Sequence, residues 1–406
     1  MKNIKKLKEV INQFHFLELL NTDLNEYQVL RGCKYNTVIL VGIGGSSLGA
    51  KLLADLNQSN KKFHAIDHIN SEVITNLLSN LDLSDTIFII QSKSGNTLET
   101  LSTYNIIKKT YFDYQFKSNN TIVIGNHFIF CTGVGTTLDL ESKSLKSRVF
   151  YLNEKVGGRF SVLSCMGFVV ATLLDIPIPV ILESAKKYAI DSNIASDTQN
   201  SSDHTFKTNT VIRKISNNIG ESLGINYIKT PLSPNNCIED IVRIITDSEV
   251  RTIVLLNYNH HLNLLGDWLV QLVSESLGKD KKEFILFSFK GVADQHSSLQ
   301  MLEDGIRNKF IFAIPPTFGP DIAVPNTNIT LNQQLKAEYK GTLDSLNKIH
   351  KIHQFDESVN IYQYLGQIII FFEIFVAYLG IANDINPFDQ PGVEKSKQLT
   401  KKYLRL

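Results

Sequence analysis

The sequence predicts an α/β protein built from two doubly wound parallel-sheet domains, followed by a helical C-terminal segment. Three observations support this prediction. Short β-branched and apolar runs alternate with segments of helical period in the first half of the chain. The alternation resumes in the second half, after a polar stretch at 191–204. A length of 406 residues with 43% hydrophobic residues is sufficient for two such domains.

Strands are predicted from runs rich in Val, Ile, Phe and Thr, and helices from apolar residues spaced three or four apart. In the first half, the predicted strands are 37–41, 63–67, 86–90, 121–124, 128–132 and 148–152. The predicted helices between and after them are 47–56, 71–81, 98–109 and 162–174. In the second half, we predict strands at 252–257, 283–289 and 309–314 and a helix at 262–277.

Interruptions of these patterns predict the domain boundaries. Pro177-Ile178-Pro179 and the polar stretch place a junction near 180–205, so we expect a first domain at 1–190 and a second at 191–330. Residues 330–378 have helical character, which ends before Asn386-Pro387 and a last polar helix. We therefore expect residues 331–406 to form a helical segment that packs on both domains.

One apolar stretch, 365–382, is nearly long enough to span a membrane. It contains Gln367 and Glu373, and an ionised carboxylate is costly in the middle of a bilayer. A buried helix of a large domain is the favoured interpretation, with a membrane-associated protein as the alternative.

Composition excludes recognition by a strong overall charge. Basic and acidic residues number 41 and 40, so no long-range field attracts nucleic acid or a membrane surface. The cysteines are widely spaced, without a Cys-x-x-Cys pair, which is typical of a reducing compartment. No apolar core of signal-peptide length follows the basic N-terminus, so we expect a cytoplasmic protein. The four cysteines are Cys33, Cys131, Cys165 and Cys237.

A run of hydroxyl side chains lies where the strand 86–90 gives way to the helix beginning near Leu98. It includes Ser92, Ser94 and Thr97, with Lys93 between the serines. A helix start presents unpaired N–H groups and partial positive charge, and hydroxyls add donors, so a phosphate monoester is the expected occupant. The alternative is a Ser/Thr helix cap with nothing bound.

A glycine-rich turn follows the strand 37–41, in the sequence GIGGSSLG at 42–49. The third glycine of a dinucleotide fingerprint would fall at Ser47, so we reject a nucleotide site. Glycines still allow a ligand to approach the backbone, and ligands bind beyond the carboxyl ends of parallel strands.

Four further clusters contain residues able to do chemistry. Arg159 lies at a glycine turn, where it could face an oxyanion, and Gln271 and Glu275 share one helix face. His296 follows the strand 283–289, and histidine moves protons near neutral pH. Lys397 lies among other lysines. Taken singly, each also fits a solvated surface residue.

The set, in this order, resembles the glucose-6-phosphate isomerase (phosphoglucose isomerase) family, which has two sugar isomerase (SIS) domains. The resemblance covers residues 37–400 and consists of six collinear motifs. They are GIGGSSLG at 42–49, SKSGNTLET at 92–100, GGRFSVLS at 157–164, SESLGKD at 274–280, DQHSSLQ at 294–300 and INPFDQPGVEKSK at 385–397.

The resemblance implies roles for the matching residues. The phosphate would be held by Ser92, Lys93, Ser94 and Thr97, and the sugar would be contacted by Gly45, Ser46 and Gln271. It also implies a homodimer, with the histidine supplied by the neighbouring subunit. For catalysis, it implies that Glu275 moves the proton between C1 and C2, Arg159 stabilises the enediolate, and His296 and Lys397 assist ring opening, with Glu99 supporting the histidine.

Aldose–ketose isomerisation requires such residues on chemical grounds. One carboxylate can take a proton beside a carbonyl and return it one carbon away, and a cation lowers the energy of the enediolate. No external oxidant or reductant is needed, so no cofactor is expected. No His/Asp/Glu cluster with ligand spacing predicts a metal. The resemblance implies interconversion of glucose 6-phosphate and fructose 6-phosphate, in glycolysis and gluconeogenesis.

Several residues depart from the family pattern. Pro391 replaces a common aromatic, Ser396 a glycine, and Leu277 a polar or small residue, while the histidine loop has Asp294-Gln295 in place of Gly-Gln. These changes bear on rate and subunit contacts more than on reaction type. Two alternatives stay open: an isomerase with broader choice, such as mannose 6-phosphate, and a non-catalytic sugar-phosphate-binding SIS protein.

Overall fold

A computed structural model describes residues 11–118, 122–192, 228–229, 237–280, 282–357 and 360–405. The chain forms two compact units that are interleaved along the sequence. The first comprises Met1–Lys186, His261–Glu283 and Asn360–Leu406, and the second comprises Lys187–His260 and Phe284–Val359. The predicted division at 190 and 330 follows chain order, and part of its junction, 193–205, lies outside the described residues.

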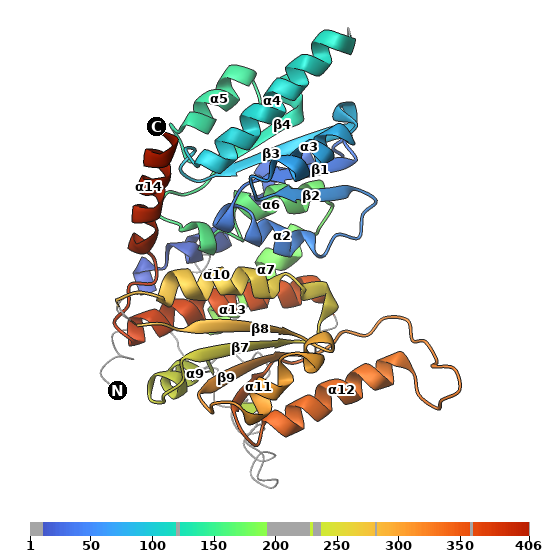
Figure 1. Cartoon of the computed structure of the whole chain (residues 1–406), viewed down its shortest axis with the longest axis vertical. Helices are drawn as coiled ribbons and strands as arrows, with labels where there is room; N and C mark the ends of the chain where they lie inside the picture. The colour runs from blue at the N-terminus through green and yellow to red at the C-terminus, as the bar shows by residue number, and fades with distance from the viewer. Residues whose placement is uncertain are drawn as a thin grey trace, which may run out of the picture. The chain divides into compact units, whose positions relative to one another are not determined.

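The first unit is built on a five-stranded parallel sheet of order β2-β1-β3-β4-β5 (Figure 1). All carboxyl ends of its strands lie at one edge, since each pairing is parallel. The strands are β1 (Thr37–Val41), β2 (Lys62–Ile66), β3 (Thr86–Ser92), β4 (Phe128–Thr132) and β5 (Arg148–Tyr151). Five of the six strands predicted in this half are therefore present.

Helices cover both faces of this sheet. On one face, Ile74, Tyr104 and Leu138 of three helices pack on strand residues such as Phe88 and Phe130. These helices are α3 (Ser71–Ser79), α4 (Leu98–Ser118) and α5 (Thr137–Leu145). The opposite face contacts the helix α6 (Cys165–Leu173), against which the helix α2 (Leu48–Ala54) packs. Gln91 of β3 donates to the Met166 carbonyl at 2.8 Å on that side.

Four more helices have residues in the first unit. They are α7 (Ile178–Asp191), which runs into the second unit at Lys187, α10 (Leu265–Leu277), α13 (Ile361–Ala382) and α14 (Glu394–Leu404). The helix α13 is apolar and long enough to cross a membrane, yet 89% of its most apolar window is buried inside the structure. This burial agrees with the expected core helix.

The second unit also has a five-stranded parallel sheet, of order β6-β10-β9-β7-β8. Its strands are β6 (Ile228–Lys229), β7 (Thr252–Asn257), β8 (Ile285–Lys290), β9 (Lys309–Ile314) and β10 (Lys351–Gln354). Its helices are α9 (Cys237–Thr246), α11 (Leu299–Asp304) and α12 (Leu331–Leu346). Leu302 of α11 and Leu343 of α12 pack on Val254 and Ile311 of the sheet. The predicted doubly wound α/β class is confirmed.

Two element predictions were wrong. The region 330–378 is not continuously helical, because β10 pairs with β9 between α12 and α13. Ile352 and His353 of this strand are buried. In place of the strand predicted at 121–124, Val123 precedes a 3₁₀ turn at Ile124–His127, and Thr121 lies outside the described residues.

Candidate active site

The hydroxyl loop joins the carboxyl end of β3 to α4. The Ser92 hydroxyl lies 2.8 Å from the Thr97 hydroxyl and 3.5 Å from the Ser94 hydroxyl. Ser94 Oγ also accepts from the Asn96 amide at 3.3 Å. The three hydroxyls therefore meet just before Leu98, the first residue of α4. Converging O–H donors at a helix start suit the oxygens of a phosphate.

The loop after β4 supports the hydroxyl loop. Thr132 Oγ1 donates to the Ser92 carbonyl at 2.7 Å, and Thr137 Oγ1 donates to Asn96 Oδ1 at 2.6 Å. Gly95 has φ +64°, and a Cβ there would lie 2.4 Å from Thr136 Oγ1. Glycine is required at this position for both reasons. Sequence reasoning missed this second loop, although a Gly/Thr-rich run directly after a strand was a usable signal.

Lys93 extends from the hydroxyl loop toward the ends of β4 and β5. It is half-buried and lines a cavity of about 530 Å³ together with Thr136, Tyr151 and Glu154. Burial lowers the pKa of the Lys93 ammonium; nearby Glu154 raises it and Arg159 lowers it. The charge of Arg159 therefore acts on Lys93, so the hydroxyl loop lies near the loop that carries Arg159.

The backbone of the glycine turn lies close to three other parts of the site, and its glycines leave no room there for a side chain. A Cβ on Gly42 would lie 3.1 Å from the Gln91 carbonyl, and one on Gly45 would lie 2.4 Å from the Gly158 carbonyl carbon. Gly44 has φ +57°, and a Cβ there would lie 3.1 Å from Gln271 Nε2. Ser46, the last residue of the 3₁₀ turn at Gly44–Ser46, is half-buried. The turn therefore lies next to β3, the arginine loop and α10.

The helix α10 places Gln271 and Glu275 on one face, as predicted. Gln271 Nε2 donates to Glu275 Oε2 at 2.9 Å. The other carboxylate oxygen, Oε1, lies 3.4 Å from Arg159 Nη1. The Glu275 side chain is 22% exposed, whereas that of Arg159 is 2% exposed. A partly accessible carboxylate next to a buried cation is an arrangement suited to proton transfer with charge stabilisation.

Most N–H groups of the Arg159 guanidinium donate to Ser276 and to the segment 387–390. Its Nε donates to Ser276 Oγ at 2.7 Å, and its Nη2 donates to the carbonyls of Pro387 and Asp389 at 2.6 and 2.9 Å. Nη1 reaches Gln390 Oε1 at 3.4 Å. Burial lowers the pKa of the guanidinium, while Glu275 and Asp389 raise it. The Nη1 side therefore faces the carboxylate and the site, and the rest fixes the segment 387–390.

Gln271 has one unused polar atom. Its Oε1 is buried and has no hydrogen-bond partner among the described residues, although its Nε2 is occupied by Glu275. A buried acceptor without a donor is costly unless a ligand supplies one. A sugar hydroxyl next to the glycine turn would do so.

Lys397 lies on α14, which begins shortly after the segment bound by Arg159 and ends near the start of α4. The helix follows Gln390, and its residues Thr400, Tyr403 and Leu404 line a cavity of about 730 Å³ with Leu98 and Glu99 of α4. Figure 1 shows α14 running along one edge of the first unit. The exposed Lys397 ammonium lies 2.9 Å from Glu394 Oε1 of its own helix. Glu99 is half-buried in the first turn of α4.

His296 belongs to the second unit. It ends the 3₁₀ turn Ala293–His296, directly after β8, and its side chain is exposed. The neighbouring Gln295 fixes this turn by donating to the hydroxyls of Tyr258 and Thr342 at 2.6 and 2.7 Å. The other predicted residues all lie in the first unit.

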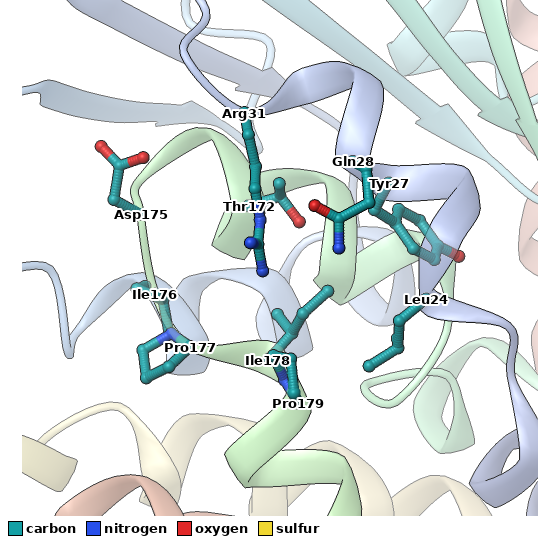
Figure 2. A pocket seen from close by; sticks show the side chains of 10 residues that line it. All are labelled: Leu24, Tyr27, Gln28, Arg31, Thr172, Asp175, Ile176, Pro177, Ile178 and Pro179. Carbon is teal, nitrogen blue, oxygen red and sulfur yellow. The ribbon is translucent and has the colours of Figure 1, made fainter.

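Another cavity of the first unit contains none of the predicted residues. Figure 2 shows it, about 300 Å³ in volume, with the Arg31 side chain extending toward Ile178. Its lining comes from the 3₁₀ helix Leu24–Leu30 with the following Arg31, from Thr172 of α6, and from the loop and helix start at 175–179. Within the described residues, no three His, Cys, Asp or Glu side chains are grouped to hold a metal.

Comparison with known proteins finds relatives along nearly the whole chain. A family model described as phosphoglucose isomerase matches residues 1–198. The glucose-6-phosphate isomerase of Methanocaldococcus jannaschii is 27% identical over 94% of this chain and 87% of its own length. That of Campylobacter jejuni is 26% identical over 96% of this chain and 91% of its own. The chain is therefore similar to phosphoglucose isomerases over nearly its whole length.

Solved structures show the same fold. A hypothetical protein of Thermus thermophilus is 25% identical, with a TM-score of 0.80 over 99% of this chain and 95% of that chain. A glucose-6-phosphate isomerase of Chlamydia trachomatis is 23% identical, with a TM-score of 0.71 over 96% of this chain and 73% of that chain. The phosphoglucose isomerase fold therefore extends through both units.

Some residues that shape this candidate site escaped prediction. Ser276, Lys279, Asp389 and Gln390 hold Arg159 or the segment next to it. Ser276 and Lys279 lie within the predicted motif at 274–280, and Asp389 and Gln390 within that at 385–397. The motifs were thus recognised, but contacts between them are not visible in a sequence.

Proposed function

We propose that this chain interconverts glucose 6-phosphate and fructose 6-phosphate through a cis-enediolate. The observation that supports the proposal most directly is the Glu275 carboxylate, placed between Gln271 and Arg159 beside the glycine turn. Similarity to phosphoglucose isomerases supports the same reaction. The names of the relatives give the substrate.

The proposed proton path uses one base. In open-chain glucose 6-phosphate, Glu275 removes the C2 proton, and the electron pair forms the C1–C2 double bond while O1 becomes negative. The O2 hydroxyl proton passes to O1, the protonated Glu275 returns its proton to C1, and O2 becomes the ketone. The positive charge of Arg159 stabilises the enediolate in both forms. Atoms and charge balance without a cofactor.

The phosphate is proposed to anchor the substrate away from the reacting carbons. Ser92, Ser94 and Thr97 donate hydroxyl hydrogens, and Lys93 adds a positive charge. Binding energy from this remote group orients C1 and C2 over Glu275. Gly45 and Ser46 then line the sugar, and Gln271 Oε1 accepts from one of its hydroxyls.

Ring opening is assigned to His296 and Lys397, with Glu99 as the carboxylate partner of the histidine. As part of the same proposal, the active form is a homodimer in which the exposed His296 enters the site of the partner subunit. Exposure of His296 on its own unit is consistent with such a contact. The free cysteines Cys33, Cys131 and Cys165 are compatible with the proposed cytoplasmic location.

A coupled assay with fructose 6-phosphate and with mannose 6-phosphate tests the function. We expect turnover of fructose 6-phosphate to glucose 6-phosphate. Comparable turnover of mannose 6-phosphate would replace the proposal by a broader phosphosugar isomerase. Binding of both sugars without turnover of either would instead identify a sugar-phosphate-binding protein and contradict the proposed catalysis.

A further inference from the structure

The turn after α10 holds the segment that leads to α14. Lys279 Nζ donates to the carbonyls of Asn386 and Asp389 and lies 2.6 Å from Asp389 Oδ1. Its side chain is 8% exposed, so the charge is largely removed from water and depends on these three oxygens. In the same turn, Lys282 Nζ donates to the Asn383 carbonyl at 2.7 Å.

The same segment is held from its other side. Arg159 donates to the carbonyls of Pro387 and Asp389, and the ring of Phe388 lies 5.6 Å, centroid to centroid, from both Phe14 and Phe160. The residues 386–390 are therefore fixed by two cations and an aromatic contact. We refer to this arrangement, with Lys279 at its centre, as the terminal clamp.

Apart from the open cavity that Thr400, Tyr403 and Leu404 line with α4, the helix α14 has little other support. Each of its residues, Glu394–Leu404, is exposed, so it gains little from apolar burial. The ion pair of Lys397 with Glu394 is internal to the helix and exposed, and such a pair contributes little. The orientation of α14 within the first unit is consequently set mainly by the residues immediately before it.

We propose that Lys279 is a positioning residue that orients α14, and with it Lys397, through the terminal clamp. The inference rests on the proposed function for its kinetic part, because Lys397 is assigned there to ring opening. Loss of the clamp would free α14 while Glu275, Gln271 and the hydroxyl loop stay in place. Ring opening would then fail, and proton transfer on an open-chain substrate would continue.

The main variant is Lys279→Met, which keeps the length of the side chain and removes its charge and donors. Hydrogen exchange of the α14 amides should rise by roughly 10-fold or more, because the helix opens locally. Trypsin should cut within 395–402 faster than in the wild type. The value of kcat for fructose 6-phosphate should fall roughly 10- to 100-fold, as expected when a catalytic group is misplaced by about 1 Å, with KM nearly unchanged.

A substrate that cannot cyclise separates the steps. With 5-deoxyfructose 6-phosphate, which lacks the ring-forming hydroxyl, Lys279→Met should exchange the C1 proton at nearly the wild-type rate. The conservative variant Lys279→Arg should recover part of the turnover of fructose 6-phosphate. Lys109→Met serves as the control, since Lys109 is an exposed lysine paired with Asp113 on α4.

Asp389→Ala provides an independent test, since it removes one acceptor of the clamp and leaves both cations. It should raise α14 exchange by itself and add nothing in the Lys279→Met background. Unchanged α14 exchange in both single variants would overturn the clamp, whatever happens to activity. If the wild type lacks isomerase activity, the proposed function fails, but the exchange experiment still tests the clamp.

Discussion

Glu275 is held from two directions, and this sets what its substitution should do. Gln271 donates to one carboxylate oxygen, and the Arg159 guanidinium lies beside the other. The Arg159 guanidinium, in turn, uses most of its donors on the segment 387–390. The catalytic contribution proposed for Arg159 therefore relies on charge at Nη1 rather than on a full set of hydrogen bonds to substrate.

Glu275→Gln should abolish isomerisation with little effect on binding. The amide keeps the size of the side chain but cannot take a proton, so we expect kcat to fall roughly 10³-fold or more. The measurement is deuterium transfer between C1 and C2 of fructose 6-phosphate, together with its affinity by calorimetry. Glu283→Gln, at an exposed position, is the control. Persisting exchange would mean that another residue is the base.

The hydroxyl loop can be tested by removing two of its donors. Each hydrogen bond to a charged phosphate contributes about 1.5–3 kcal/mol, so Ser94→Ala with Thr97→Ala should weaken binding of fructose 6-phosphate roughly 10²- to 10⁴-fold. Non-phosphorylated fructose should bind as weakly to the variant as to the wild type. Thr110→Ala on the exposed side of α4 is the control. If the variant and the wild type bind fructose 6-phosphate with equal affinity, the hydroxyl loop does not bind the phosphate.

At the scale of elements, α13 carries a buried acid within an apolar helix. Glu373 is 1% exposed, its Oε1 has no hydrogen-bond partner among the described residues, and burial raises the pKa of its carboxyl well above 4.5. The folded protein keeps this group protonated at pH values where the unfolded chain has lost the proton. The unfolded state then binds fewer protons, so stability falls as pH rises above about 4.5.

Glu373→Gln should remove this pH dependence. One proton of difference corresponds to about 1.4 kcal/mol per pH unit, so the melting temperature of the wild type should fall between pH 5 and pH 8 relative to the variant. The variant should be the more stable protein at pH 8. Parallel curves for the two proteins would show that Glu373 is ionised in the fold. Glu72→Gln, on the exposed face of α3, provides the baseline.

The sequence predicted the elements with strong periodicity and missed those defined by pairing. The strand β3, the start of α4 and the helix α10 were predicted because their apolar spacing is regular. The strand β10 has four residues with Ile352 and His353 buried side by side in sequence, so no alternation distinguishes it from helix. It exists because β9 offers a parallel edge.

The sequence predicted the separate motifs of the candidate site but not the hydrogen bonds between them. Residue types at strand ends indicated the hydroxyl loop, the glycine turn and the pair on α10. The contacts of Arg159 with Pro387 and Asp389 span 228 and 230 residues of chain, and no local pattern encodes them. For the same reason, nothing in the local sequence indicated that Lys279 binds the segment 386–390.

For the whole molecule, the proposed dimer has a quantitative consequence. If His296 completes the site of the partner subunit, a chain with Glu275→Gln and one with His296→Ala form a mixed dimer with one intact site. Equimolar mixing with random exchange should therefore restore about a quarter of wild-type activity from two inactive variants. Activity of the mixed sample and of each variant alone is the measurement.

A second pairing controls this experiment. Glu275→Gln mixed with Arg159→Lys should recover nothing, because both residues come from the same chain and every mixed site lacks one of them. No recovery in the first mixture, with subunit exchange verified by labelled chains, would place His296 in the site of its own chain or outside catalysis altogether.

The interleaving of the two units also bears on synthesis. The chain passes between units at 186/187, 260/261, 283/284 and 359/360. The first sheet emerges from the ribosome early, yet α10 and α13, which complete the same unit, are translated much later. The nascent N-terminal half therefore keeps apolar surface uncovered until its own C-terminal helices are made, and premature termination near residue 360 would leave a truncated product that cannot close its core.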